Sequence, residues 1–217
     1  MVKTVIFDMD GVIVDTEPVH RYAYHTHFKE LGIEVPEELY TSFTGFSTKN
    51  TYQKLQEIYG FEGNVLDLVH RKRFLFNDAF DSKPDLDLIE GVRDLIIGLH
   101  NNGVELLLGS SASKSTIEKV FTRFELYPYF KHLVSGEDFP KSKPDPAVFL
   151  KASELATHSK DESIIIEDST NGILAAKAAG IRVIGYQSAN SKMQAYDLAD
   201  YVVKDFKAID ASYIVNL

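Results

Sequence analysis

The amino-acid sequence predicts an α/β protein, a three-layer sandwich with a mostly parallel sheet, to which a small all-helical cap domain is attached. Short apolar runs recur along the chain with helical patterns between them, and this alternation is typical of a sheet covered by helices on both faces. One segment near the N-terminus breaks the alternation and shows helical periodicity alone. The first observation predicts the sheet, and the second predicts the cap.

Six apolar runs are expected to form the strands. They lie at residues 5–7, 106–108, 132–134, 164–166, 183–184 and 201–203. Runs such as the three isoleucines at 164–166 are apolar without alternation, which fits strands that are buried on both faces of a parallel sheet.

Helical patterns separate these runs. Apolar residues recur at helical spacing through 88–102, and Gly103 follows as a stop signal. Ser115 with Glu118 resembles a capping box and predicts the start of a second helix. Two prolines mark the start of a third helix, within residues 144–156.

The segment 17–81 is predicted to be the cap, and residues 1–16 and 82–217 are predicted to form the α/β core. Residues 17–80 contain 12 of the 25 Phe and Tyr residues of the chain. Packing explains this enrichment, because a small core gains most buried area per residue from large rings.

The composition is that of a globular protein and disfavours several classes of function. The chain has 217 residues with 23 Lys+Arg and 32 Asp+Glu, a net charge of −9, so nucleic acid and anionic membranes are disfavoured as partners. The absence of cysteine excludes disulfides, thiol catalysis and cysteine-ligated metal sites. Asp8 and Asp10 interrupt the first apolar run before a secretory signal could form, and no run reaches the ~18 apolar residues of a membrane span. We therefore expect a soluble, cytoplasmic protein, and nothing in the sequence demands more than a monomer.

Polar residues with catalytic potential follow four of the predicted strands. They are Asp8 and Asp10, Ser110 and Ser111, Lys143, and Glu167 and Asp168. In an open parallel sheet, ligands bind beyond the carboxyl ends of the strands, so these side chains should converge at one edge. Taken singly, such residues are more often turn formers, helix caps or surface charges. Taken together, the carboxylates would repel one another unless a cation intervened, and Mg²⁺ is the hard, oxygen-binding cation that fits best.

These residue types suit phosphoryl transfer. A lysine and a metal can neutralise a phosphate monoester, and hydroxyl and backbone N–H groups can bind its oxygens. One carboxylate can act as a nucleophile and become an aspartyl phosphate. A second carboxyl group two residues later can protonate the leaving alkoxide and then activate water.

The same residues carry a resemblance to a known family. Phe7-Asp8-Met9-Asp10-Gly11-Val12 resembles motif I of the haloacid dehalogenase superfamily, Ser110 resembles motif II, and Lys143-Pro144 resembles motif III. Glu167-Asp168-Ser169 with Asn171-Gly172 resembles motif IV. The helical segment after motif I is similar to the C1 cap of the β-phosphoglucomutase-like branch, which includes many sugar-phosphate phosphatases. The resemblance implies a Rossmann-like core.

The resemblance also implies roles for individual residues. Asp8 would be the nucleophile and a metal ligand, and Asp10 the general acid/base, with its backbone carbonyl at Mg²⁺. Ser110 would bind the transferring phosphoryl group, with Ser111 as the weaker candidate, and Lys143 would bridge Asp8 and the phosphate. Asp168 would ligate the metal, and Glu167 would share that role or act through water.

The sequence leaves two activities open within this branch. His20 stands where the branch often places a polar residue, and Gly45-Phe46-Ser47 matches its cap loop. The mutases follow that loop with an arginine that clamps the second phosphate of the substrate, whereas this chain has Thr48 and then Lys49. The mutases also use a lysine late in the cap, for which Lys72 and the neighbouring arginines are candidates.

We therefore expect an Mg²⁺-dependent phosphatase that hydrolyses a small phosphate monoester, a phosphorylated metabolite of the sugar-phosphate type. His20 and Lys49 are the candidate substrate-binding residues of the cap. The alternative is a β-phosphoglucomutase, which interconverts β-glucose 1-phosphate and glucose 6-phosphate. A receiver domain, which also combines acids, a hydroxyl and a lysine, would be about half as long and would need no cap.

Overall fold

The predicted strands pair in one parallel sheet. The computed structural model of the protein describes residues 1–188 and 193–217. Its sheet has six strands in the order β3-β2-β1-β4-β5-β6, all parallel. The strands are β1 (Thr4–Phe7), β2 (Glu105–Ser110), β3 (His132–Ser135), β4 (Ser163–Glu167), β5 (Arg182–Tyr186) and β6 (Tyr201–Val203). This confirms the predicted α/β class.

The strand order places β1 in the middle of the sheet, between β2 and β4. Val5 pairs with Leu106 of β2 on one side and with Ile164 of β4 on the other. The chain adds β2 and β3 on one side of β1 and then β4, β5 and β6 on the other, so the strand order reverses between β1 and β4, and ligands bind at the carboxyl ends of the strands at such a point. The loops after β1, β2 and β4 therefore meet at one edge.

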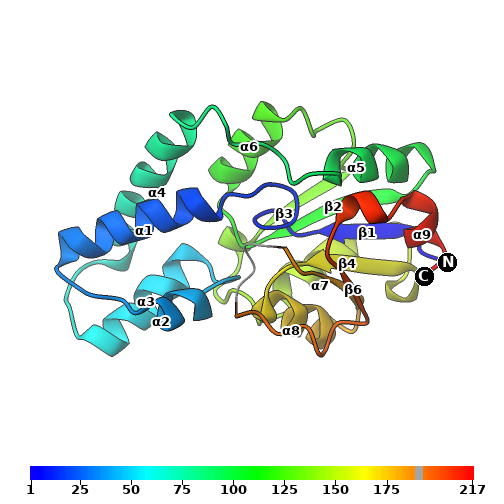
Figure 1. Ribbon diagram of the computed structural model, residues 1–217. Helices are drawn as coiled ribbons and strands as arrows, with labels where there is room; N and C mark the ends of the chain where they lie inside the picture. The colour runs from blue at the N-terminus through cyan, green and yellow to red at the C-terminus, as the bar shows by residue number, and fades with distance from the viewer. Residues whose placement is uncertain (189–192) are drawn as a thin grey trace.

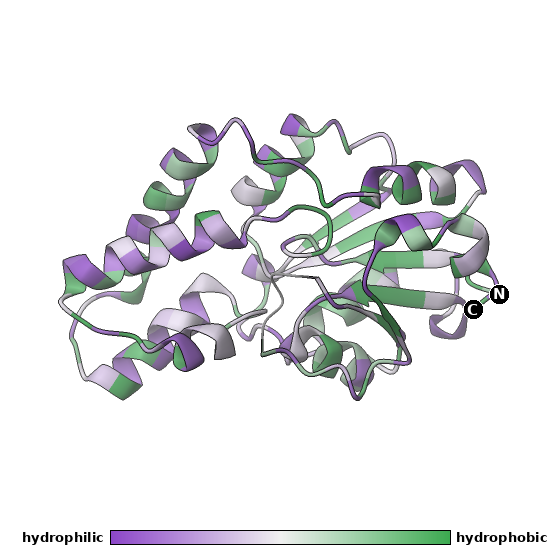
Figure 2. Ribbon diagram, in the orientation of Figure 1, coloured by the Kyte–Doolittle hydropathy of each residue, from purple (hydrophilic) through white to green (hydrophobic). Residues whose placement is uncertain are grey.

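Helices cover both faces of the sheet (Figure 1). Helices α5 (Val92–Asn101), α6 (Lys114–Arg123) and α9 (Ala211–Val215) pack on one face, and α7 (Ala147–Leu155) and α8 (Thr170–Ala179) pack on the other. Figure 2 shows that the strands between them are strongly hydrophobic. Ile6 and Ile165 point into the layer with α7 and α8, while Val5 and Ile164 point into the opposite layer. Because successive strand residues face opposite ways, a strand buried on both sides must be apolar throughout.

The remaining helices form a separate group beyond the carboxyl edge of the sheet (Figure 1). They are α1 (Glu17–Leu31), α2 (Glu37–Ser42), α3 (Thr48–Tyr59) and α4 (Val65–Asp81). The group has a small core of its own, in which the rings of Tyr24, Phe28 and Tyr52 are buried together. We propose that 17–81 acts as a cap over the sheet edge, since α1 begins at Glu17 and α4 ends at Asp81.

Several helix boundaries differ from the prediction. Helix α5 starts at Val92 instead of residue 88, because Leu88 forms an antiparallel bridge with Val14 and Gly91 adopts a φ of 85° at the N-cap. The N-cap of α6 is Ser113, whose hydroxyl accepts a hydrogen bond from the Thr116 amide, so the capping box predicted at Ser115 is wrong. The short helix α2 was not predicted. Among the described residues, no helix has the length and apolar character needed to cross a membrane.

A buried carboxylate ties the amino end of the sheet together. Glu105, at the start of β2, accepts hydrogen bonds from the Lys131 ammonium (2.6 Å), the Thr157 amide (2.8 Å) and the Thr4 hydroxyl (3.1 Å). Burial alone would raise the pKa of Glu105, but these donors outweigh burial and lower the pKa from 4.5 to about 2.

We expect Glu105→Gln to reduce the free energy of unfolding at neutral pH by about 2 kcal/mol. Each pKa unit corresponds to about 1.4 kcal/mol, and the total is reduced because Lys131 is half exposed and solvent screens its charge. The pKa of Glu105 is lower in the folded protein than in the unfolded chain. Its contribution is therefore fully present above pH ~5 and is lost as the pH falls toward ~2. Urea denaturation across this pH range should show that the free energies of unfolding of the wild type and Glu105→Gln approach each other as the pH falls. The exposed Glu118→Gln is the matched control, and a gap that did not depend on pH would contradict the prediction.

Candidate active site

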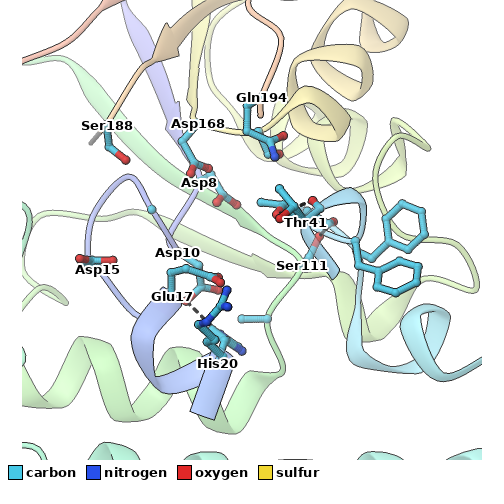
Figure 3. A pocket seen from close by; sticks show the side chains of 18 of the residues that line it. Asp8, Asp10, Asp15, Glu17, His20, Thr41, Ser111, Asp168, Ser188 and Gln194 are labelled. Carbon is cyan, nitrogen blue, oxygen red and sulfur yellow. Dashed lines mark hydrogen bonds and ion pairs between the residues drawn. The ribbon is translucent and has the colours of Figure 1, made fainter. Parts of the chain in front are cut away.

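A cavity of about 720 Å³ lies between the cap and the carboxyl ends of the strands. This volume is within the usual range for small-molecule sites. Its lining includes Asp8, Asp10, His20, Ser111, Lys143 and Asp168. Figure 3 shows Asp8 and Asp168 side by side, with Asp10 and His20 nearby at the start of α1. Residues from the loops after β1, β2 and β4, and from the loop before α7, therefore face one cavity.

Lys143 links two carboxylates at the base of this cavity. Its ammonium group lies 2.6 Å from Asp8 Oδ1 and 2.8 Å from Glu167 Oε1, and all three side chains are almost fully buried. The other oxygen of Glu167 accepts hydrogen bonds from the amide and the hydroxyl of Ser169, at 2.7 and 2.9 Å. Burial alone would lower the pKa of Lys143, but the two carboxylates outweigh it and raise the pKa, so the ammonium stays charged.

The carboxylates around Asp8 form a set that suits a hard divalent cation. Asp8, Glu167 and Asp168 are buried and each offers an oxygen atom, all within 4.8 Å of one another. Only oxygen donors are present, and carboxylate oxygens are the protein ligands that Mg²⁺ prefers. Two glycines allow the backbone to approach these carboxyl groups closely. A Cβ atom at Gly11 would lie 2.2 Å from Asp168 Oδ2, and one at Gly172 would overlap the Glu167 carboxyl group.

Burial raises the pKa of Asp8 to about 7 despite the opposing charge of Lys143, and the charges of Glu167 and Asp10 raise it further. The carboxyl groups of Asp8 and Glu167 share Lys143 as a common cation, and Asp10 adds to the repulsion. A divalent cation at these oxygens would relieve this repulsion and lower the pKa of Asp8. The donor set therefore fits the predicted metal.

Asp10 has a different environment at the start of the cap. Its Oδ1 accepts a hydrogen bond from the Thr16 hydroxyl and lies 3.5 Å from His20 Nε2. Burial alone would raise the pKa of Asp10, but the contacts with His20 and Thr16 lower it below the usual value. The Asp10 carboxyl group is thus held in place by Thr16, the N-cap of α1, and by His20 in the first turn of that helix.

A buried lysine completes this group of residues. Lys72 Nζ lies 2.6 Å from His20 Nδ1 and sits over the rings of Tyr24 and Phe76, at 4.4 and 4.8 Å from their centroids. Burial lowers the pKa of Lys72 to about 7, although the charge of Asp10 opposes this effect. Sequence reasoning considered Lys72 only as one candidate among the basic residues of α4, and the structure shows that it contacts His20.

The structure separates the two serines at the end of β2. Ser111 lines the cavity, and its hydroxyl donates to the backbone oxygen of Gly45 at 2.8 Å. Ser110 is fully buried, and its hydroxyl accepts a hydrogen bond from the Ala112 amide at 3.1 Å. Sequence reasoning favoured Ser110 as the phosphate-binding hydroxyl, but the side chain at the cavity surface is that of Ser111.

The cap residues also differ in their placement. Thr48 lines the cavity, whereas Lys49 is exposed and is not among the lining residues described. Both lie in the first turn of α3, whose N-cap is Ser47. Adjacent helix residues point about 100° apart, so one of them faces the cavity while the next faces away. The structure therefore does not bring Lys49 to the site.

One segment of the cap contacts two loops of the core and the first turn of α8. The Asn171 amide donates to the backbone oxygens of Ser42 and Thr44, at 3.2 and 2.7 Å. Ser111 donates to the oxygen of Gly45. The Ser142 amide donates to Asn50 Oδ1 at 3.0 Å. Segment 42–50 is thus docked next to the loops that carry the candidate catalytic residues, and several of its residues line the cavity.

We expect Asn171→Ala to weaken this docking and to raise KM about fivefold, because two partly exposed hydrogen bonds together contribute about 1 kcal/mol. Steady-state kinetics would measure the change. Asn216→Ala, which removes an exposed asparagine from the end of the chain far from the cavity, is the control. A KM that stayed at the wild-type value would mean that docking of segment 42–50 does not depend on Asn171.

The parallel sheet flanked by helices, with buried acids and a lysine at its carboxyl edge, defines a Rossmann-like α/β protein. The profile of the haloacid dehalogenase-like hydrolase family matches residues 5–186, so the chain belongs to this family.

Two curated relatives of similar length carry different activities. A phosphorylated carbohydrates phosphatase of Thermotoga maritima is 28% identical over 186 residues, which cover 84% of this chain and 83% of the relative. A β-phosphoglucomutase of Bacillus subtilis is 29% identical over 188 residues, which cover 84% and 82%. The sequence is therefore similar both to a phosphatase and to a mutase.

Solved structures share the whole fold. A β-phosphoglucomutase from Clostridium difficile superposes with a TM-score of 0.87 at 24% identity, and covers 100% of this chain and 96% of its own. CbbY from Rhodobacter sphaeroides, solved in complex with phosphate, has a TM-score of 0.82 at 24% identity, with 95% of each chain covered. At this identity the likeness concerns the fold alone.

Proposed function

We propose that the protein is an Mg²⁺-dependent phosphatase that hydrolyses a small sugar phosphate through an aspartyl phosphate on Asp8. The observation that carries this proposal is the position of Asp8, which faces the cavity beside Asp168 while Lys143 contacts it at 2.6 Å. A carboxylate held in this way can attack phosphorus, and the lysine balances the charge of the incoming phosphate. The relative named as a phosphorylated carbohydrates phosphatase supports this assignment.

In the first half of the reaction, a carboxylate oxygen of Asp8 attacks the phosphorus atom of the ester. The bond between phosphorus and the ester oxygen breaks, and the leaving alkoxide takes a proton from the carboxyl group of Asp10. Lys143 would bind the transferring phosphoryl oxygens, and the Ser111 hydroxyl would join it by turning away from the Gly45 oxygen, with Ser110 supporting the loop behind them. The alcohol leaves, and Asp8 carries the phosphoryl group.

In the second half, a water molecule attacks the same phosphorus atom. Asp10, now ionised, takes one proton from this water, and the bond between phosphorus and Asp8 breaks to release inorganic phosphate. The contacts with His20 and Thr16 that lower the pKa of Asp10 favour its ionised form, which is the form that accepts the proton in this step. Docking of segment 42–50 keeps bulk water away between the two steps.

The metal would be held by Asp8, Asp168 and Glu167 together with Asp10, whose backbone carbonyl the family resemblance assigns to it. Bound there, Mg²⁺ supplies positive charge that keeps Asp8 ionised and offsets the charge of the phosphate. Glu167 contributes mainly through Lys143 and Ser169, since both of its oxygens already accept hydrogen bonds from them.

A β-phosphoglucomutase is the second candidate, and one contact favours it. Lys72 touches His20, which in turn faces Asp10, and a lysine late in the cap is a feature of the mutases that the sequence resembles. Against it stands Thr48, which occupies the position of the arginine that clamps a second phosphate in mutases. Threonine offers a hydroxyl in place of a bidentate cation.

One assay separates the two activities. The purified protein with Mg²⁺ is supplied with β-glucose 1-phosphate and a catalytic amount of glucose 1,6-bisphosphate. Release of phosphate and free glucose supports the phosphatase, whereas glucose 6-phosphate without phosphate release would identify a mutase. No turnover on a panel of sugar phosphates, with or without Mg²⁺, would overturn both.

A further inference from the structure

Among the residues that the structure describes, the cap wall of the active-site cavity carries hydroxyl groups and the carboxyl groups of Glu17 and Glu37, and its one arginine is paired with Glu37. The polar side chains of this wall include those of Glu17, Arg21, Tyr24, Glu37, Tyr40, Thr48 and Thr51. They come from α1, α2 and α3, whereas Asp8 lies at the end of β1. The part of a substrate that contacts them is thus the leaving group, not the phosphoryl group that is transferred.

Both cations of the cavity are already paired. Among the lining residues that the structure describes, only Arg21 and Lys143 are permanently charged bases. Lys143 lies between two carboxylates at the phosphoryl end. Both terminal nitrogens of Arg21 bind the carboxylate of Glu37, each at 2.6 Å, and the guanidinium group covers the ring of Tyr40. Glu37 also lines the cavity, so this pair adds no net charge.

The other groups on this wall suit neutral hydroxyls. The phenol of Tyr40 donates to Glu17 Oε1 at 3.0 Å, and the phenol of Tyr24 and the hydroxyls of Thr48 and Thr51 also line the cavity. The carboxyl group of Glu17 has oxygen atoms that can accept further hydrogen bonds from substrate hydroxyls beside the one from Tyr40. Figure 3 shows Glu17 next to Asp10 and His20, where the leaving oxygen of a bound ester would be.

We propose that this wall is a subsite for a neutral, polyhydroxylated leaving group, with Glu17 and Tyr40 as its main hydrogen-bonding partners. The enzyme then discriminates against substrates whose leaving group bears a second phosphate or a carboxylate. Such an anion would lie near Glu17 and Glu37 with no cation of its own, and leaving it unpaired there is unfavourable. This inference rests on the proposed phosphatase function and narrows its substrate class.

The test compares leaving groups of different charge under one set of conditions. The wild-type protein with Mg²⁺ is assayed with p-nitrophenyl phosphate, a panel of tetrose, pentose and hexose monophosphates, fructose 1,6-bisphosphate and phosphoglycolate. We expect kcat/KM for the best neutral sugar monophosphate to exceed the values for the bisphosphate and phosphoglycolate by at least ~10-fold, which is the effect of one uncompensated charge contact of about 1.4 kcal/mol.

Two variants test the residues. Thr48→Arg places a cation on the wall and is expected to raise kcat/KM for the bisphosphate relative to the best monophosphate about tenfold. Thr122→Arg adds the same charge at an exposed position of α6 and should leave that ratio unchanged. Glu17→Ala is expected to reduce kcat/KM for the sugar monophosphate about tenfold more than for p-nitrophenyl phosphate, which has no hydroxyl groups on its ring.

The possible outcomes separate this inference from the proposed function. Hydrolysis of p-nitrophenyl phosphate together with a preference for the bisphosphate or phosphoglycolate would overturn the subsite and leave the phosphatase standing. Equal losses on both substrate types in Glu17→Ala would also overturn it. Failure to hydrolyse any compound in the panel would overturn the phosphatase, and the subsite with it.

Discussion

Replacing Asp8 by asparagine is expected to abolish phosphate release, with kcat reduced by at least ~10⁴-fold, the scale of loss seen when a nucleophile is removed. An amide oxygen is a poor nucleophile towards phosphorus, and Asp10 cannot take over, because its carboxyl group is engaged by Thr16 and His20. The loss should appear in kcat on every substrate tested, measured as phosphate release under saturating conditions.

The fold should survive this substitution. Asparagine has the size of aspartate, and Lys143 keeps its second partner, Glu167, at 2.8 Å. Thermal unfolding of Asp8→Asn next to the exposed control Asp161→Asn would check this point. Residual turnover above about one hundredth of the wild-type rate would exclude Asp8 as the covalent nucleophile.

Replacing Lys72 by methionine should stabilise the protein while it slows the reaction. The ammonium group of Lys72 is 2% exposed and contacts a histidine nitrogen and two ring faces. Exchanging a buried charged group for an apolar one of similar volume is often stabilising by ~1–4 kcal/mol. We expect a gain of about 3 kcal/mol in the free energy of unfolding at pH 7, and a decrease in kcat of about tenfold because His20 loses the partner that orients it.

The pH dependence of this gain has a definite sign. The pKa of Lys72 is about 7 in the folded protein and 10.5 in the unfolded chain, so unfolding takes up a proton between these values. Wild-type stability therefore rises with pH between about 7 and 10.5, and the advantage of Lys72→Met is largest at or below pH 7 and shrinks above it. Urea denaturation at pH 7 and pH 9.5 would measure the gain in the free energy of unfolding and its decrease with rising pH. Lys54→Met, at an exposed position of α3, is the control, and a destabilised Lys72→Met would contradict the prediction.

The sheet and the polar residues at its carboxyl edge could be predicted because each depends on a local pattern. A strand that is buried on both faces must be apolar throughout, as at 164–166, and the residue after it must lie at the sheet edge. This is why Asp8 and Asp168 could be assigned to one site although 160 positions separate them in the chain.

The parts of the site that could not be predicted depend on tertiary packing or on a single step along the backbone. His20 and Lys72 are 52 residues apart, and their contact exists only because α1 packs against α4. Ser110 and Ser111 differ by one residue, and the residue at which β2 ends decides which hydroxyl faces the cavity. The choice between Thr48 and Lys49 depends in the same way on the rotation of α3 about its axis.

The docking of segment 42–50 on the core also offers a way to watch the cap move. Asn50 and Ser142 share a hydrogen bond, so their neighbours Lys49 and Lys141, both exposed, lie on opposite sides of the same seam. The chain has no cysteine that would compete for a thiol-reactive dye. Fluorophores attached to Lys49→Cys and Lys141→Cys would quench each other while the cap is docked and recover emission when it lifts, so one labelled molecule could be followed through a complete turnover.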